Sequence, residues 1–387
     1  MRKRIPVNSN ILRWARKTAG MQVADVAKKM KKDEATIISW ESGDSTPTYV
    51  QLEKLAYKIY KRPLALFFFP EPPKEETPKH YFRTLPEYEI EMMSSQMLYL
   101  LRKARSMQIN LADLNDKINP AKRNIIHELN FYPDTPVAKM VISVRKFLGI
   151  NLSTQFTWKS IDEALGEWRH SLENHGVYIF KEAFKDEIFS GFCLYDKQFP
   201  IIYINNSKPK TRQIFSIFHE LAHLLLGTGG VDTRIQDYIN LLRGDDKKIE
   251  VLCNQFAGEF LVPDLDFSRR IANTKIDDST INDLADQYKV SREVILRKFY
   301  NKSLIDQNYY SIKIQQWSDE GKKGLSGSGG NYYATKCAYL GKSYLELAFR
   351  RYYQNRISID ELADYLEVKV NNISGIESIL LNKVGLE

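Results

Sequence analysis

An apolar segment with three ionisable residues at its centre constrains the fold of this chain more than any other feature. The segment, IFSIFHELAHLLLG, contains the pattern H-E-x-x-H at His219, Glu220 and His223. A separation of four places both imidazoles on one face of a helix, one turn apart, where they can share a metal ion. Because a buried helix normally excludes such groups, the pattern predicts a common partner, and a divalent cation supplies one. The alternative is two hydrogen-bonded core histidines beside a salt-bridged glutamate.

A catalytic metal of this kind needs a third protein ligand and an open position for water. The best candidate is Glu250, early in a helix predicted over residues 247–261, and Glu259 on another face of that helix is a weaker one. Cys253 could also coordinate a metal, but a small core residue explains it better. Two imidazoles and a carboxylate favour Zn²⁺, and Mn²⁺ would accept the same ligands. Glu220 lies beside the imidazoles, where it can polarise a water at the open position.

A second HEL sequence provides an internal comparison. His127-Glu128-Leu129 begins in the same way, but Phe131 stands where the second histidine would be required. We therefore predict a structural role for this segment.

The excess positive charge of the chain lies at its N-terminal end. The 387 residues carry a net charge of +8, from 56 basic and 48 acidic side chains. Residues 1–70 hold 14 of the basic and 6 of the acidic ones, which leaves 42 of each for residues 71–387. Such a basic region suits a polyanion, most often nucleic acid, although a merely solvated basic domain would have the same charge.

A change in composition near residue 70 predicts a domain boundary. Four short helices are predicted before it, and the Pro- and Glu-rich sequence PEPPKEETP begins at Pro70. We predict a multidomain, mainly α protein with an all-α N-terminal domain and one α+β domain that holds a small sheet. The predicted parts are the N-terminal domain at 1–69, a linker and helical connector at 70–150, the α+β core at 151–275, and a helical C-terminal region at 276–387.

The core is expected to place its sheet beside the H-E-x-x-H helix. Strand-like runs rich in β-branched and aromatic residues alternate with turn residues ahead of that helix. The predicted elements are strands near 177–180, 189–195 and 201–204, helices at 158–175 and 211–226, and two earlier helices near 94–118 and 137–148.

Cysteine content and hydropathy exclude several classes of protein. Three widely spaced cysteines exclude a disulfide scaffold and a cysteine-rich zinc module, and they fit a reducing compartment. The longest apolar run, residues 64–70, is far too short to cross a bilayer. The basic start MRKRIPVNSN has no apolar stretch typical of a signal peptide. We therefore expect a cytoplasmic protein with no membrane partner.

Two motifs together resemble a known family. The segment IIYIN, then FSIFHELAHLLL, then E-x-x-x-N-x-F-A-G-E-F-L-V-P resembles the ImmA/IrrE family of metallo-endopeptidases over roughly residues 150–300. The resemblance implies a zincin-like fold with His219, His223 and Glu250 as metal ligands and Glu220 as general base.

The same resemblance implies a substrate site and a biological context. The strand at 201–205, with Tyr203 and Asn205, would be an edge strand along which an extended substrate pairs. The substrate would be a specific protein, such as a helix-turn-helix repressor or a toxin-linked protein, in mobile-element, stress-response or toxin–antitoxin regulation. The alternative is a regulator or antitoxin that binds DNA and a toxin without being an active protease.

The N-terminal domain resembles the XRE (Cro/repressor-like) helix-turn-helix family. The letters that match are Gly20, Val26-Ala27, Thr36-Ile37, Trp40-Glu41, Gly43 and Pro47. The resemblance implies DNA binding, with the start of the third helix facing the major groove. The sequence departs from the family pattern at Val23, where a phosphate-contacting Gln is usual, and at Asp33-Glu34, which open the third helix. The expected DNA contacts are Lys28, Lys29, Lys32, Thr36 and Ser39.

Two alternatives stay open for the helix-turn-helix patterns. The N-terminal domain could serve protein interaction or dimerisation instead of DNA binding, and a homodimer is possible. Similar patterns at residues 284–299 and 357–373 are expected to pack on the catalytic domain rather than to bind DNA. The glycine-rich stretch at 321–330 is expected to be a linker or a lid.

Overall fold

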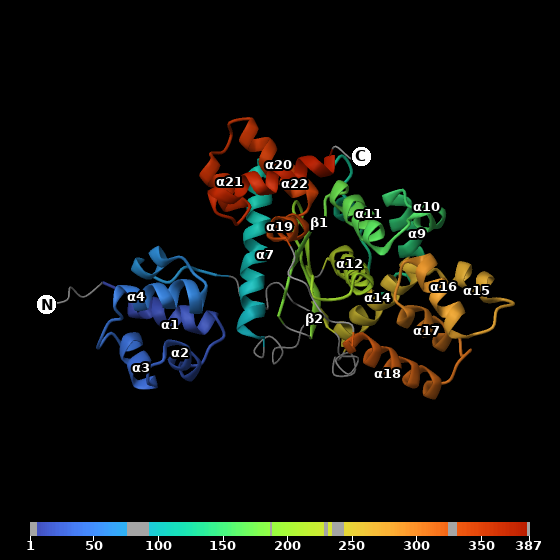
Figure 1. Ribbon diagram of the computed structural model, residues 1–387, viewed down its shortest axis with the longest axis horizontal. Coiled ribbons are helices and arrows are strands. Elements are labelled where there is room, and N and C mark those ends of the chain that lie inside the picture. Colours follow the sequence, from blue (N-terminus) through green and yellow to red (C-terminus); the bar gives the residue numbers. More distant parts are fainter. Residues whose placement is uncertain are drawn as a thin grey trace. The chain divides into compact units, whose positions relative to one another are not determined.

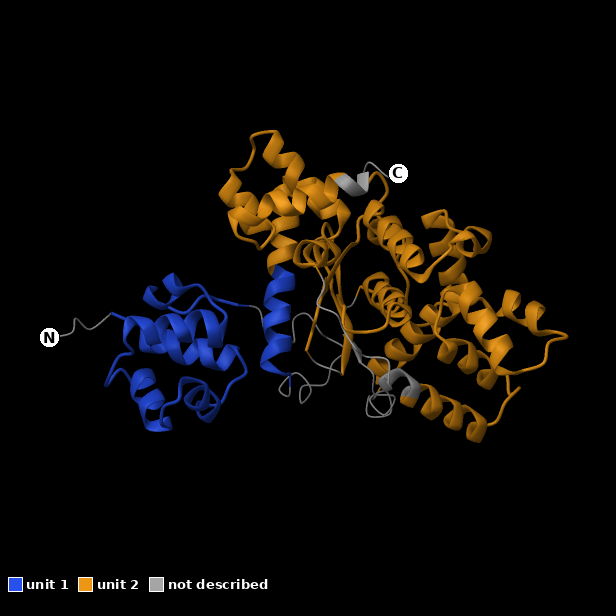
Figure 2. Cartoon of the chain, viewed as in Figure 1, with its two compact units in different colours: residues 1–81, 85–105 blue, residues 82–84, 106–387 orange. Residues whose placement is uncertain are grey.

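The computed structural model is mainly helical with one small sheet, which confirms the predicted fold class (Figure 1). It describes residues 6–75, 93–185, 188–227, 231–233, 244–323 and 331–384. The chain divides into unit 1 (1–81 with 85–105) and unit 2 (82–84 with 106–387), coloured in Figure 2. The predicted division into four domains is finer than this and stays a prediction. In the described ranges, no helix is long and apolar enough to cross a membrane.

Unit 1 contains the short helices expected at the N-terminal end. Asn8 caps the first of them, and the Asp33 side chain caps the third by accepting from the backbone N–H of Thr36 at 2.8 Å. Gly43 ends the third helix at a φ of +89°, a left-handed conformation that glycine adopts without strain. The elements are α1 (Ser9–Thr18), α2 (Val23–Met30), α3 (Glu34–Ser42), α4 (Tyr49–Glu53), the π-helix η1 (Lys54–Tyr60), the 3₁₀ helix η2 (Leu64–Phe68) and α7 (Ser95–Leu114), which continues into unit 2.

The core of unit 1 combines the apolar faces of these helices with a buried ion pair between Arg16 and Glu41. Ile11, Trp40 and Leu52 are buried together. Arg16 donates to both carboxylate oxygens of Glu41, at 2.7 Å and 2.9 Å. Because both charges are buried, losing either partner would strand the other at a cost of about 3–5 kcal/mol.

Within the described residues, the sheet of unit 2 has four strands in the order β1-β3-β2-β4. β3 pairs in parallel with β1 and antiparallel with β2, and β2 pairs antiparallel with β4. The helix α12 packs across β2 and β3, and α11 packs on β1 and α12. The bounds are β1 (Tyr178–Glu182), β2 (Phe189–Leu194), β3 (Ile201–Asn205), β4 (Val231–Thr233), α11 (Ile161–Asn174) and α12 (Lys210–Leu225).

The prediction that residues 201–205 form an edge strand is wrong, because β3 lies inside the sheet. It has hydrogen-bonded neighbours on both sides, and all five of its residues are buried. Tyr203 stacks on Phe192 with ring centroids 5.3 Å apart, and Asn205 donates to the backbone oxygen of Phe189 at 2.8 Å. Neither residue is therefore available to pair with a substrate. The uninterrupted apolar run IIYI is typical of a strand buried on both faces, which is the signal for an interior position.

Aromatic packing joins α12 to the next long helix, α14 (Gly244–Leu261). The Phe218 ring stacks on Phe260 with centroids 4.1 Å apart, and Trp168 of α11 meets Phe218 edge-on at 4.9 Å. These contacts fix how α12 and α14 face each other. The other helices between residues 125 and 271 of unit 2 are α8 (Ile125–Glu128), α9 (Val137–Leu148), α10 (Leu152–Thr157) and α15 (Asp264–Ile271).

The two later helix-turn-helix-like segments belong to unit 2. The first corresponds to α16 and α17, whose apolar residues join the main core, which confirms that it packs on that domain. Its basic side chains are engaged, since Arg292 lies 4.6 Å over the Trp317 ring and Lys298 pairs with Glu259 at 2.7 Å. The helices are α16 (Asp278–Tyr288), α17 (Arg292–Asn301), α18 (Gln307–Lys323), α19 (Tyr332–Leu340), α20 (Lys342–Tyr353), α21 (Ile359–Tyr365), η3 (Val370–Asn372) and α22 (Ile373–Val384).

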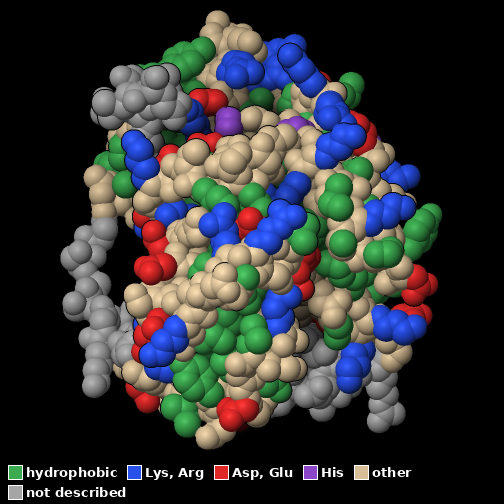
Figure 3. All heavy atoms as spheres, turned by 90° about the vertical axis from the view of Figure 1, so that its right-hand side faces the viewer, with side chains coloured by type: hydrophobic (Ala, Val, Ile, Leu, Met, Phe, Trp, Pro, Cys, Tyr) green, Lys and Arg blue, Asp and Glu red, His purple; other side chains and the backbone are tan. Residues whose placement is uncertain are grey.

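Surface charge on the face of unit 2 around α15 and α16 is mixed. Figure 3 shows basic and acidic side chains interspersed there. This pattern agrees with the balance of 42 basic and 42 acidic residues after residue 70. Of the glycine-rich stretch, residues 321–323 end α18, and residues 324–330 lie outside the described residues, so its role as a linker or lid stays a prediction.

Candidate metal centre

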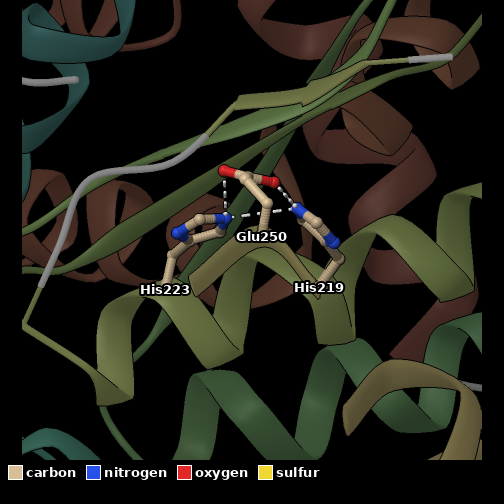
Figure 4. Close-up of side chains that lie close together, drawn as sticks. All are labelled: His219, His223 and Glu250. Atoms are coloured by element: carbon tan, nitrogen blue, oxygen red, sulfur yellow. Dashed lines mark hydrogen bonds and ion pairs between the residues drawn. The ribbon is translucent and has the colours of Figure 1, made fainter. Parts of the chain in front are cut away.

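The helix α12 carries its ionisable residues in a buried position. His219, Glu220 and His223 are at most 1% exposed, in a helix whose residues from Ile214 to Leu225 are almost all buried. The i, i+4 spacing points both imidazoles to the same side, toward α14. Figure 4 shows Glu250 of α14 entering between them.

The three predicted ligand residues converge on one point. The Nε2 atoms of His219 and His223 are 3.2 Å apart. The Glu250 carboxylate approaches both, with 3.2 Å from Oε1 to His223 Nε2 and 3.5 Å from Oε2 to His219 Nε2. One ligand atom from each residue lies within 4.8 Å of the others, and within the described ranges this is the only such group able to hold a metal.

Asn254 fixes which nitrogen of His219 faces this point. Its amide Nδ2 donates to the backbone oxygen of Glu250 at 3.1 Å. Its Oδ1 is thereby left to accept the Nδ1–H of His219, at 3.2 Å. This hydrogen bond turns the Nε2 of His219 toward the carboxylate, so that Nε2 is the atom that can bind a metal. Two imidazole nitrogens and a carboxylate that meet in a buried site are the ligand set of a divalent metal, so these residues fit one.

The ionisation of Glu250 agrees with this assignment. Burial by itself raises the pKa of the carboxyl, but the facing His223 and His219 outweigh burial and lower the pKa to about 2. Glu250 is therefore an anion at neutral pH, ready to bind a cation.

Sequence reasoning missed Asn254 as a functional residue. The signal was its position four residues after Glu250, which puts both side chains on one face of α14. We predict that Asn254→Ala weakens metal binding about 10- to 100-fold, as loss of a residue that orients a ligand usually does. Competition with a chelator measures this, and Asn254→Asp, which keeps an oxygen acceptor for His219, should bind more tightly than Asn254→Ala.

The other candidate residues are not members of this ligand set. Cys253 is fully buried, and burial together with Glu250 and Glu220 raises the pKa of its thiol, so it stays protonated. Glu259 accepts from Lys298 at 2.7 Å and from the backbone N–H of Asp264 at 2.9 Å. Glu220 lies next to His219 in sequence but outside the group of three converging ligands. This leaves its carboxylate for a role other than coordination.

The second HEL sequence lies in a different environment. His127 Nε2 is 2.6 Å from the backbone oxygen of Lys197, and Glu128 pairs with Arg123 at 2.6 Å on the surface. These contacts agree with the structural role predicted for the segment.

The expected DNA contacts all lie in unit 1. Lys28, Lys29 and Lys32 are exposed near the end of α2. The Thr36 hydroxyl donates to Asp33, and the Ser39 hydroxyl lies 2.7 Å from that of Ser45. The lysines are thus free to reach phosphates, whereas both hydroxyls already have partners within the domain.

Comparisons with known proteins agree with this division of roles. Residues 172–300 match the peptidase family M78, described as the IrrE N-terminal-like domain. Residues 12–56 match a helix-turn-helix family. A search of curated proteins finds no match. The first match covers all four residues of the candidate centre, and the second covers the five expected DNA contacts.

Proposed function

Because this chain carries a helix-turn-helix domain fused to an ImmA/IrrE-type domain, we propose that it is a DNA-binding regulatory metallo-endopeptidase. The observation that carries the proposal is the convergence of His219, His223 and Glu250 beside the buried carboxylate of Glu220. A purely structural metal site would not need the carboxylate of Glu220 beside its ligands.

Each residue has a distinct part in the proposed hydrolysis. A zinc or manganese ion held by the three ligands would lower the pKa of a water molecule and polarise the peptide carbonyl. Glu220 takes the proton from the attacking water and gives it to the leaving amine. Asn254 keeps the Nε2 of His219 directed at the centre through the 3.2 Å hydrogen bond to Nδ1.

The burial of the centre supports a protease that is held inactive. His219, Glu220, His223 and Glu250 are at most 2% exposed, so a peptide cannot reach them in this conformation. We predict negligible cleavage of a generic unfolded substrate such as casein, and cleavage of one specific partner, assayed by gel electrophoresis with metal added. Rapid casein digestion by the wild type, abolished in Glu220→Gln, would show an unregulated peptidase.

The proposed substrate is a helix-turn-helix repressor or a toxin-linked protein, cut within an exposed linker. We place the protein in the cytoplasm, because its three cysteines are buried and form no disulfide bond in the structure. Its context would be mobile-element, stress-response or toxin–antitoxin regulation, and a homodimer is compatible with it. Co-expression with neighbouring gene products, followed by mass spectrometry of new termini, tests for the substrate.

DNA binding by unit 1 gives a salt-dependent prediction. Replacing Lys28, Lys29 and Lys32 together by Gln should weaken binding of the full chain and flatten the plot of log K against log salt. The slope should fall by about 2–3, because each lost phosphate contact removes about 0.9. The control replaces three exposed lysines of unit 2: Lys159, Lys197 and Lys275. Equal slopes for the two triple variants would contradict DNA binding by unit 1.

One observation favours a second function for unit 1, as an interaction module of a regulator or antitoxin. The exposed side of α3 presents Glu34, Ala35 and Ile38, and Ile38 is 54% exposed. None of them forms the bidentate contacts by which Arg, Asn or Gln read bases. Loss of partner binding, with DNA binding intact, in an Ile38→Lys variant would support this second function.

A further inference from the structure

The N-terminal end of α12 borders a pocket that the proposed hydrolysis does not use. It has a volume of about 440 Å³, and Ile161, Gln213 and the β3–α12 connection line it, the latter through Asn206, Lys208 and Lys210. A helix rises about 1.5 Å per residue, which places Thr211 at the pocket about 12 Å from His219. The pocket is thus separate from the metal centre but on the same helix.

The backbone at this end of α12 is prepared for an anion. Pro209 stands at the N-cap, no side chain caps the helix, and no acidic residue lies in its first turn. The adjacent helix α11 differs, since the Ser160 side chain caps it and Asp162 and Glu163 occupy its first turn. Uncapped N–H groups and the helix dipole make such an end attractive to phosphate.

A buried lysine beside the pocket has no counter-ion. Lys181 of β1 is only 9% exposed, and within the described residues its ammonium makes no hydrogen bond or ion pair. Burial, and then the positive charges of Arg169 and Lys210, lower its pKa to about 7, against the weaker opposing effect of Asp162 and Glu173. Lys181 does not line the pocket itself, but the backbone oxygen of the neighbouring Glu182 accepts from the N–H of Asn206, which does line it, at 2.8 Å. A buried ammonium among like charges either loses its proton or is stabilised by an anion that joins it.

The buried side chain of Gln213 is a second, independent feature of this pocket. It is 3% exposed, and its Nε2 donates to the backbone oxygen of Lys208 at 2.8 Å. That bond fixes the orientation of the amide, and the Oε1 on its other side has no hydrogen-bond partner. A buried acceptor without a donor costs about 1–3 kcal/mol. A molecule in the pocket that reaches Oε1 would therefore have to supply an O–H or N–H group.

We propose that this pocket binds a small molecule that carries a phosphate group and a hydroxyl donor. The phosphate lies against the first N–H groups of α12 and the ammonium groups of Lys208 and Lys210, and the hydroxyl donates to Gln213 Oε1. In this conformation Lys210 pairs with Asp162, and the phosphate takes the place of that carboxylate. The volume of the pocket suits a small metabolite. Because α12 carries both histidines of the metal centre, occupancy of the pocket stabilises the helix that holds them.

Hydrogen phosphate is the simplest probe, because it has both the charge and an O–H, whereas sulfate has the charge alone. The test is isothermal titration of the full chain with inorganic phosphate at constant ionic strength. The preparation is metal-free, so that phosphate cannot bind a metal ion. It also carries Lys28→Gln, Lys29→Gln and Lys32→Gln, so that phosphate cannot bind unit 1 through these lysines.

We expect saturable phosphate binding that is at least 10-fold tighter than sulfate binding. Lys208→Gln and Lys210→Gln should each weaken it about 10-fold, and Lys197→Gln, an exposed lysine elsewhere on unit 2, should not change it. Gln213→Met should remove the preference for phosphate over sulfate. Lys210 is exposed, so its variant should fold even if that of Gln213 does not. No saturable binding, equal binding of sulfate by the wild type, or binding that is unchanged in Lys210→Gln would overturn the proposal.

Discussion

A Glu220→Gln variant is expected to bind metal as the wild type does and to lose hydrolysis of its protein substrate. The amide keeps the shape of the side chain but cannot accept a proton from the attacking water. General acid–base catalysis contributes about 10²–10⁴-fold, so kcat should fall by at least that factor. Since Glu220 lies outside the group of converging ligands, metal content should stay near one ion per chain. Elemental analysis and cleavage of the specific partner measure the two effects separately.

The chain offers a matched control for this variant. Glu128 follows a histidine in the second HEL sequence but pairs with Arg123 on the surface. Glu128→Gln should leave both cleavage and metal content unchanged. If Glu220→Gln instead cleaved its partner at the wild-type rate, Glu220 would not be the base, and the proposed hydrolysis would be wrong. Absence of cleavage by the wild type, with metal bound and the correct partner present, would favour the regulator or antitoxin function.

Local patterns in the sequence predicted the elements of the fold well. The helix α9 has the predicted bounds, because apolar spacing and turn residues at its ends are local signals. The pairing of His219 with His223 followed from helical spacing alone. The partnership with Glu250 required a neighbouring helix. Its place early in that predicted helix made it the best candidate, and the E-x-x-x-N-x-F-A-G-E motif supported it through the family resemblance.

Strand order could not be read from local patterns in this way. The chain order β1, β2, β3 becomes β1, β3, β2 in the sheet, because β3 inserts between the first two strands. Register and order depend on contacts between residues far apart in sequence, such as Tyr178 opposite Ile201. The burial of Lys181 could not be predicted for the same reason. Its sequence position is that of an ordinary strand residue, and the packing of β1 against α11 buries it.

The carboxylate of Glu250 is expected to decide whether the centre holds a metal. Glu250→Gln keeps the volume of the side chain but removes its charge, so two neutral imidazoles would have to hold a divalent ion alone. We expect metal affinity to fall at least 100-fold, measured by competition with a chelator. His219→Ala and His223→Ala should show losses of similar size, because each removes one of the three converging ligands.

The pH dependence of metal binding separates the contributions of these ligands. With a pKa of about 2, Glu250 stays ionised well below neutral pH, so protonation of the carboxylate does not limit binding there. A fall in metal affinity on mild acidification should therefore not be ascribed to protonation of Glu250. Two controls on the same helix are Glu259→Gln and Cys253→Ser, which should keep the wild-type affinity because neither residue belongs to the ligand set. Full metal occupancy in Glu250→Gln, with loss in Cys253→Ser, would instead make Cys253 the third ligand.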